Sequence, residues 1–100
     1  MSVEKMSSQQ IKTDLKSLSG WELKDEKLHR ELKFKNFVQA WGFMTQVAIL
    51  AEKANHHPEW SNVYSRVIID LTTHEAGGIS QRDFDLAEKI NEVLAAMGVS

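Results

Sequence analysis

Histidine is the residue type in this sequence best suited to chemistry near neutral pH, because imidazole has an ordinary pKa of about 6.5 and both donates and accepts protons. His29 falls in a strand-like pattern, whereas His56, His57 and His74 fall in predicted loops or at element ends. His56 follows a predicted helix, whose negative dipole end favours a protonated ring and therefore a general acid. Pro58 disfavours helical backbone at His57, so the helix must end there. We expect the two adjacent rings to point in different directions.

Each candidate also has a purely structural interpretation. His56 can be a helix C-cap, and His74 can be an ordinary loop residue. Asp83 lies three residues after Ser80, so it can be half of a helix cap instead of a site residue. Three aromatic residues can belong to the core, to its rim or to a stacking wall for a flat ring; they are Trp21, Trp60 and Tyr64.

Other reaction classes fit these residues less well. A zinc site that combines the imidazoles with Glu52 or Asp83 is disfavoured, because His56 and His57 are adjacent and the helical spacings of zinc ligands are absent. The sequence has no cysteine and no G-x-S-x-G motif, so it supports nucleophilic catalysis even less than a zinc site. Two alternatives remain: the histidines transfer protons to and from a small neutral or polar ligand, or the protein catalyses no reaction.

Composition narrows the class of protein further. The 100 residues, 42% of them hydrophobic, predict a single domain over residues 1–100. A net charge of −2 and the lack of a basic stripe disfavour direct nucleic-acid binding. The longest apolar runs are five residues, far too short to span a membrane, and the start of the chain does not resemble a signal peptide. The lack of cysteine fits a cytoplasmic protein.

The first elements predicted by the pattern are a helix and a hairpin. Ser7 and Gln10 have capping-box spacing, and the apolar residues that follow keep helical steps until Gly20, which is expected to end the helix. From Trp21 to Phe34 apolar residues alternate on both sides of a charged segment, which is typical of a hairpin.

A longer helix is predicted over residues 37–54, with Asn36 as its N-cap. Twelve of its eighteen residues are apolar, and its polar residues form a stripe that leaves more than half of the circumference apolar. One sheet cannot cover so wide a face, so we expect the helix to pack against its copies in a homo-oligomer. The alternative is that the first and last helices flank it.

The C-terminal half predicts two more strands and a last helix. Residues 60–73 alternate over a length sufficient for two strands with a turn near residues 64–66, and Ser80 can cap a helix that ends at Gly98. The alternation places five residues on one face, Val63, Ser65, Val67, Ile69 and Leu71, and five on the other, Tyr64, Arg66, Ile68, Asp70 and Thr72. The order α-β-β-α-β-β-α predicts an α+β fold, a four-stranded antiparallel sheet with three helices on one face.

Glu52–Tyr64 (EKANHHPEWSNVY), then His74 after nine further residues and Asp83 after eight more, resembles the pattern of the pterin-4a-carbinolamine dehydratases. The similarity continues upstream through Gly20-Trp21-Glu22 and Gly42-Phe43-Met44-Thr45 and covers roughly residues 7–93. Asn55 departs from it, since animal members carry an acidic residue there. The departure puts one minor contact in doubt.

The resemblance implies the fold above and a lyase that dehydrates 4a-hydroxytetrahydrobiopterin to quinonoid dihydrobiopterin, which recycles the cofactor of aromatic amino acid hydroxylases. It implies no metal and no organic cofactor. His56 and His74 are expected to donate and accept protons on opposite sides of the pterin, with His57 mainly orienting it. Four further residues are implied to bind substrate or to support the site: Glu52, Trp60, Thr73 and Asp83.

The resemblance also implies partners. Family members form tetramers, dimers of dimers, in which the long central helices pack together, here residues 37–54. Animal members also serve as dimerisation cofactors of a homeodomain transcription factor through the same surface, so a protein-binding coactivator is the alternative function. With that role a nuclear location is open beside the cytoplasmic one, and any effect on DNA would be indirect.

Overall fold

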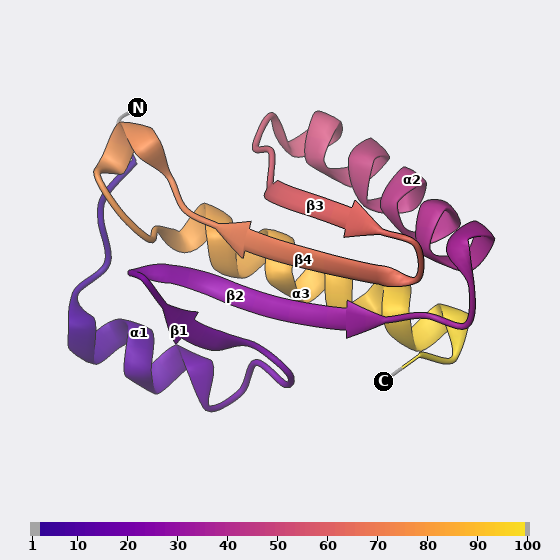
Figure 1. Cartoon of the computed structure of the whole chain (residues 1–100). Coiled ribbons are helices and arrows are strands. Elements are labelled where there is room, and N and C mark those ends of the chain that lie inside the picture. The colour runs from indigo at the N-terminus through magenta and orange to yellow at the C-terminus, as the bar shows by residue number, and fades with distance from the viewer. Residues whose placement is uncertain (1–2, 100) are drawn as a thin grey trace.

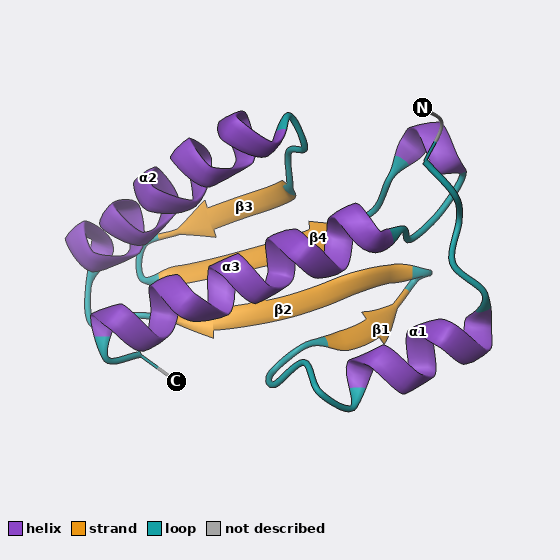
Figure 2. Cartoon of the chain, turned by 180° about the vertical axis from the view of Figure 1, so that it is seen from behind, coloured by secondary structure: helices purple, strands orange, loops and turns teal. Residues whose placement is uncertain are grey.

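The computed structural model describes residues 3–99. Over this range the chain forms three α-helices, one short 3-10 helix and a four-stranded antiparallel sheet of order β1-β2-β4-β3 (Figure 1). The elements are α1 (Ser8–Leu15), β1 (Glu22–Lys24), β2 (Lys27–Lys33), α2 (Phe37–Ala54), β3 (Glu59–Val63), β4 (Arg66–Leu71), η1 (His74–Ala76) and α3 (Gln81–Met97). Figure 2 shows the three α-helices on one face of the sheet. The predicted α+β fold and its element order are confirmed.

The core lies between the sheet and the helices. Alternate residues of the two central strands face the helices, with Leu28 of β2 opposite Leu71 of β4 and Leu32 opposite Val67, and all four are buried. α2 packs beside α3 and contributes its own buried stripe, Ala40, Phe43, Val47 and Ala51. The opposite face of the sheet carries no helix (Figure 1), and polar residues such as Glu31 and Arg66 are exposed on it.

The predicted N-caps form. The side chains of Ser7 and Asn36 accept hydrogen bonds from the backbone of the third residue that follows, at 3.1 and 2.8 Å. α1, however, ends at Leu15 and not at Gly20, because the backbone tightens into i→i+3 bonds from Lys16 onward. Gly20 has φ +85°, and a Cβ there would collide with the guanidinium of Arg30. The positive φ of the turn therefore favours glycine at this position, while the Arg30 side chain could shift to make room.

The prediction that Val63 shares a face with Val67, Ile69 and Leu71 is wrong. β3 and β4 are joined by a two-residue turn, in which Tyr64 has φ 51°. Val63 therefore pairs with Arg66 and shares the open face of the sheet with it, while Val67, Ile69 and Leu71 face the core. A two-residue turn shifts the alternation by one position, so a period of two cannot be continued through it.

α2 keeps an exposed apolar stripe on the side away from the sheet. Phe37, Val38, Trp41 and Ile49 are all exposed large hydrophobic residues, and α3, the helix that packs beside α2, leaves this stripe uncovered. Between residues 3 and 99, no helix is both long enough and apolar enough to cross a membrane.

Candidate active site

The end of α2 directs His56 into the protein. Asn55 adopts the left-handed conformation (φ 52°, ψ 42°), and the His56 backbone N–H bonds to the Ala51 carbonyl at 3.0 Å. Asparagine tolerates this conformation better than most residues. The His56 side chain, only 10% exposed, then lies with Nε2 2.6 Å from Oδ1 of Asp83. Its ring therefore contacts a carboxylate and does not cap the free helix carbonyls.

Asp83 combines the two interpretations that its spacing left open. It is completely buried, and its Oδ2 accepts hydrogen bonds from the Ser80 N–H at 2.9 Å and from the Thr73 hydroxyl at 2.8 Å. Ser80 Oγ in turn accepts from the Arg82 N–H at 3.2 Å, which completes the cap of α3. The other carboxylate oxygen is left for His56. Asp83 therefore caps α3 and holds His56 at the same time.

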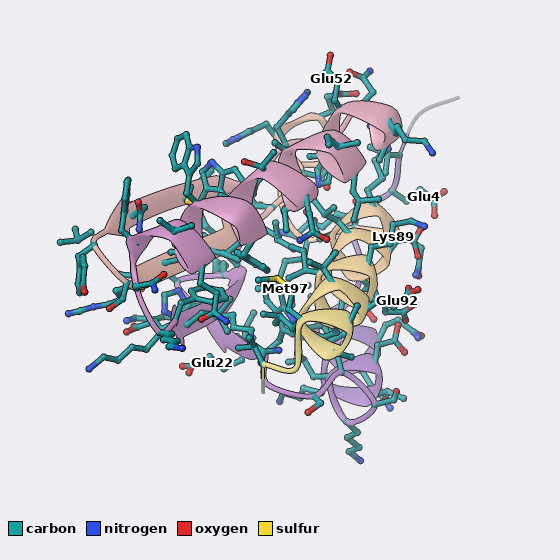
Figure 3. The ribbon with its side chains drawn as sticks, turned by 90° about the vertical axis from the view of Figure 1, so that its right-hand side faces the viewer. Glu4, Glu22, Glu52, Lys89, Glu92 and Met97 are labelled. Carbon is teal, nitrogen blue, oxygen red and sulfur yellow. The ribbon has the colours of Figure 1, made fainter. Side chains whose placement is uncertain are left out.

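His57 makes a similar contact in a different environment. Its Nε2 lies 2.8 Å from Oε1 of Glu52, but the side chains of His57 and Glu52 are 57% and 81% exposed. Figure 3 shows Glu52 at the C-terminal end of α2, on the outside of the molecule. Water competes with such an exposed pair, so its geometry is weakly held.

His74 begins η1, directly after Thr73, and is 81% exposed. Its Nε2 lies 2.9 Å from Oε2 of Glu59, whose other oxygen accepts a hydrogen bond from Lys27 Nζ at 2.6 Å. The hydrogen bond from Lys27 is the main reason that the pKa of Glu59 lies below its ordinary value; burial opposes the shift and His74 adds to it. Glu59 is therefore ionised at neutral pH.

Sequence reasoning missed both Glu59 and Lys27. Glu59 follows His57-Pro58 at the start of a strand, so its nearness to the histidines was a usable signal. Lys27 belongs to β2, which is separated from β3 by β4. Only the order of the strands brings it to Glu59, and no local pattern shows that order.

The three histidines share one arrangement. In each, Nε2 faces a carboxylate, while no hydrogen bond within residues 3–99 involves Nδ1. Within the described chain, every side-chain nitrogen or oxygen that is inaccessible to solvent has a hydrogen-bond partner. Nδ1 of His56 has no partner, so this atom must be accessible to solvent although the residue is buried. The Asp83–Thr73 contact joins the segments of His56 and His74. Each ring therefore has Nε2 on a carboxylate and Nδ1 without a partner in the described chain.

A shallow depression of about 270 Å³ lies beside His74. Its lining includes Lys27, Thr72 and the loop Gly77-Gly78, so it lies between the β1–β2 turn and η1. No group of three or more His, Cys, Asp or Glu side chains within residues 3–99 is arranged to hold a metal ion.

The aromatic candidates separate in the structure. Trp60 pairs with Ile69 on the helix-facing side of the sheet and packs against the core. Trp21 is buried and donates its indole N–H to Asn91 at 2.9 Å. Tyr64 is exposed in the β3–β4 turn, at the opposite end of β3 from Glu59. These positions support the core interpretation for both tryptophans, and contact of Trp60 with a ligand stays a prediction.

Comparison with known proteins agrees with the sequence pattern. A family model described as pterin 4 alpha carbinolamine dehydratase matches residues 4–93. A protein of Prochlorococcus marinus (strain MIT 9303) named for pterin-4-alpha-carbinolamine dehydratase is 53% identical over 91 residues, 91% of this chain and 95% of its own length. One of Rhizobium leguminosarum bv. trifolii with the same name is 48% identical over 101 residues, 99% of this chain and all (100%) of its own.

A solved structure agrees as well. The crystal structure of a transcriptional coactivator/pterin dehydratase from Brucella melitensis has a TM-score of 0.87 to this chain at 40% identity, and the match covers 90% of this chain and 98% of the other. The family model and the relatives each span most of the sequence. This chain therefore belongs to the pterin-4a-carbinolamine dehydratase family.

Proposed function

We propose that this chain catalyses the reaction for which its family is named, and that histidines carry out its proton transfers. The substrate is a pterin-4a-carbinolamine, in which C4a carries a hydroxyl group next to the ring nitrogen N5. Loss of water converts 4a-hydroxytetrahydrobiopterin to quinonoid dihydrobiopterin. The family match over residues 4–93 supports the reaction, and the arrangement of His56, His57 and His74 supports the proton transfers.

The chemistry needs one acid and one base. Hydroxide is a poor leaving group, so an acid protonates the 4a-oxygen while the C4a–O bond breaks and the N5 lone pair forms a C4a=N5 double bond. A base takes the proton from N5, so that water is the only group lost. Acid-base assistance of this kind contributes roughly 10²–10⁴ in rate.

In this proposal His56 and His74 exchange the protons and His57 orients the pterin. The observation that carries the assignment is that each ring has Nε2 held by a carboxylate, while Nδ1 has no partner within the described chain. A neighbouring carboxylate stabilises the imidazolium form and fixes the ring, as a general acid or base requires. The contacts between Thr73 and Asp83 keep the segments of His56 and His74 together.

The test is a spectrophotometric assay of carbinolamine dehydration above the uncatalysed rate. We expect His56→Ala and His74→Ala each to lower kcat by roughly 10²-fold or more, and His57→Ala to raise KM more than it lowers kcat. His29→Ala is the control, because both of its ring nitrogens are occupied. A folded triple variant at positions 56, 57 and 74 with near wild-type turnover would refute the assignment.

The exposed stripe of α2 supports a second proposal, self-association. Burial of Phe37, Val38, Trp41 and Ile49 against copies of α2 would remove large apolar side chains from water. We propose a homotetramer, a dimer of dimers, built through this helix. The Brucella melitensis protein is described as a coactivator as well as a dehydratase, so a transcription-factor dimerisation domain is a further candidate for the same surface.

Analytical sedimentation tests whether the exposed stripe of α2 holds an oligomer together. We expect Trp41→Glu to shift the chain to a smaller species, whereas Lys89→Glu on the exposed side of α3 leaves it unchanged. Equal sedimentation of both variants and the wild type would contradict the proposal. A pulldown with a helical dimerisation domain beside the dehydration assay separates the coactivator from the enzyme role. Cytoplasmic location stays a prediction from composition.

A further inference from the structure

We infer that Lys27 and Glu59 are positioning residues for His74, which hold its ring in the form with the hydrogen on Nε2 and the lone pair on Nδ1. The inference rests on the proposed function, because it assigns the nitrogen through which His74 exchanges a proton with the substrate. Neither Lys27 nor Glu59 touches the reacting atoms in this scheme. Both act through the His74 ring.

The contacts form a chain across three neighbouring strands. Lys27 is the first residue of β2 and Glu59 the first of β3, and β4 lies between these strands. The Lys27 ammonium reaches across β4 to Oε1 of Glu59 at 2.6 Å, and Oε2 lies 2.9 Å from His74 Nε2. The two oxygens of one carboxylate are therefore divided between a cation and an imidazole.

This division fixes where the hydrogen of the ring lies. An ionised carboxylate only accepts hydrogen bonds, so Nε2 of His74 must carry a hydrogen. The lone pair of the neutral ring is then on Nδ1, for which the described residues offer no partner. The hydrogen bond from Lys27 to Glu59 raises the pKa of Lys27; burial opposes the shift, and Asp70 and Asp25 add to it by charge. Lys27 and Glu59 thus both keep their charges over the working pH range.

The Lys27–Glu59–His74 contacts lie beside a depression that could hold a ligand. Lys27 and His74 both line the depression of about 270 Å³ between the β1–β2 turn and η1. A ligand that enters from this side meets His74 and Lys27 in the wall of the depression. Because the His74 side chain is 81% exposed, the ring would turn freely without a fixed acceptor.

Glu59→Gln is a sharp test, because an amide has one accepting and one donating side. Lys27 can only donate, so it selects the amide oxygen and leaves the NH₂ group for His74. An NH₂ group opposite Nε2 makes that nitrogen accept, which moves the ring hydrogen to Nδ1. With Lys27→Met added, no ammonium selects the orientation, and the amide can turn its oxygen to His74. The double variant should then return to the original ring form.

Two measurements on the full chain report these states. Imidazole ¹⁵N NMR, assigned with His74→Gln, gives the position of the ring hydrogen, and the pH profile of kcat/KM for the carbinolamine gives its consequence. We expect Glu59→Gln to move the hydrogen to Nδ1 and lower kcat about tenfold, less than at a buried site because water competes. Lys27→Met alone should lower kcat by about two- to fivefold. Added to Glu59→Gln, it should recover activity to within about threefold of Lys27→Met.

Lys24→Met is the matched control, because Lys24 pairs with Lys27 across the β1–β2 hairpin and has no ion pair within residues 3–99. It should change neither measurement. The inference would be overturned if the ring hydrogen of His74 stayed on Nε2 in Glu59→Gln. It would also be overturned if adding Lys27→Met to Glu59→Gln lowered kcat further. A wild-type chain without dehydratase activity would refute the proposed function, and the NMR measurement would still decide the ring form. The two failures are therefore distinguishable.

Discussion

The histidines occupy two regions of the molecule that use the same side chain in opposite ways. On the open face of the sheet, His29 has both nitrogens occupied: Nδ1 lies 2.7 Å from Asp70 and Nε2 lies 3.0 Å from Glu31. Where β3 begins and β4 ends, three histidines each have one nitrogen on a carboxylate and one without a partner in the described chain. A ring with no free nitrogen cannot exchange a proton with a ligand. Occupied nitrogens therefore separate structural from candidate catalytic histidines.

The largest expected effect comes from Asp83→Asn. The amide oxygen can still accept from the Ser80 N–H, so the cap of α3 survives, since asparagine caps as well as aspartate. The NH₂ group then faces His56 and moves the ring hydrogen to the nitrogen that should be free. We expect kcat to fall by roughly 10²–10⁴ and stability by about 1–2 kcal/mol, because charge-assisted hydrogen bonds become neutral ones.

The control for this variant lies in the same turn. Asp85→Asn removes the same charge from α3, but Asp85 is exposed, and its one side-chain hydrogen bond among the described residues is accepted from the Gln81 side chain at 3.0 Å. It should leave turnover and the urea midpoint unchanged. Equal losses in both variants would mean that charge near the start of α3 matters, and not the His56–Asp83 contact.

The sequence predicted most of the fold because its signals are local. Ser7, Asn36 and Ser80 are each followed by the backbone donors that they cap, and the strands alternate as a half-buried sheet requires. The errors arose where a tight turn replaced the pattern. α1 ends early at Leu15, and Val63 changes faces at the two-residue turn. Periodicity describes the interior of an element and does not describe its ends.

The candidate site was predictable in its residue types but not in its pairs. The family pattern includes both Glu52 and Asp83, but spacing could not show that one carboxylate, that of Asp83, both caps a helix and holds a ring. The Lys27–Glu59–His74 chain depends on the order of three strands. Such contacts follow from tertiary register, which a single sequence does not specify.

The next largest effect is expected on the pH dependence of stability, through His29. Burial lowers its pKa, but hydrogen bonds to Asp70 and Glu31 outweigh burial and raise the pKa above its ordinary 6.5. A raised folded pKa gives stability that is fully present below about pH 6.5 and lost as pH rises through the folded value. A neutral His29 ring carries a hydrogen on only one nitrogen, so the other nitrogen can no longer donate to its carboxylate. We expect wild type to lose about 1 kcal/mol relative to His29→Gln across this window.

Urea unfolding of both proteins between pH 5 and pH 9 measures the difference. Glu31 and Glu59 have lowered pKa values and Lys27 a raised one, so these shifted groups titrate outside the window. Dehydratase activity of His29→Gln should equal that of wild type at every pH. A loss of turnover in this variant would break the comparison between the two regions, because it would connect the open face of the sheet to the chemistry.

The smallest effect is expected from Glu52→Gln, which removes the charge opposite His57. The pair has nearly the geometry of His56–Asp83, 2.8 against 2.6 Å, but Glu52 is 81% exposed and Asp83 is fully buried. Exposed pairs are screened by water, so we expect kcat/KM to fall less than about fivefold, with no change in unfolding. Glu92→Gln on α3, well apart from Glu52 in Figure 3, is the charge control. If Glu52→Gln cost as much as Asp83→Asn, substrate binding would have to shield His57 from water, and the burial of the free protein would no longer explain which carboxylate matters.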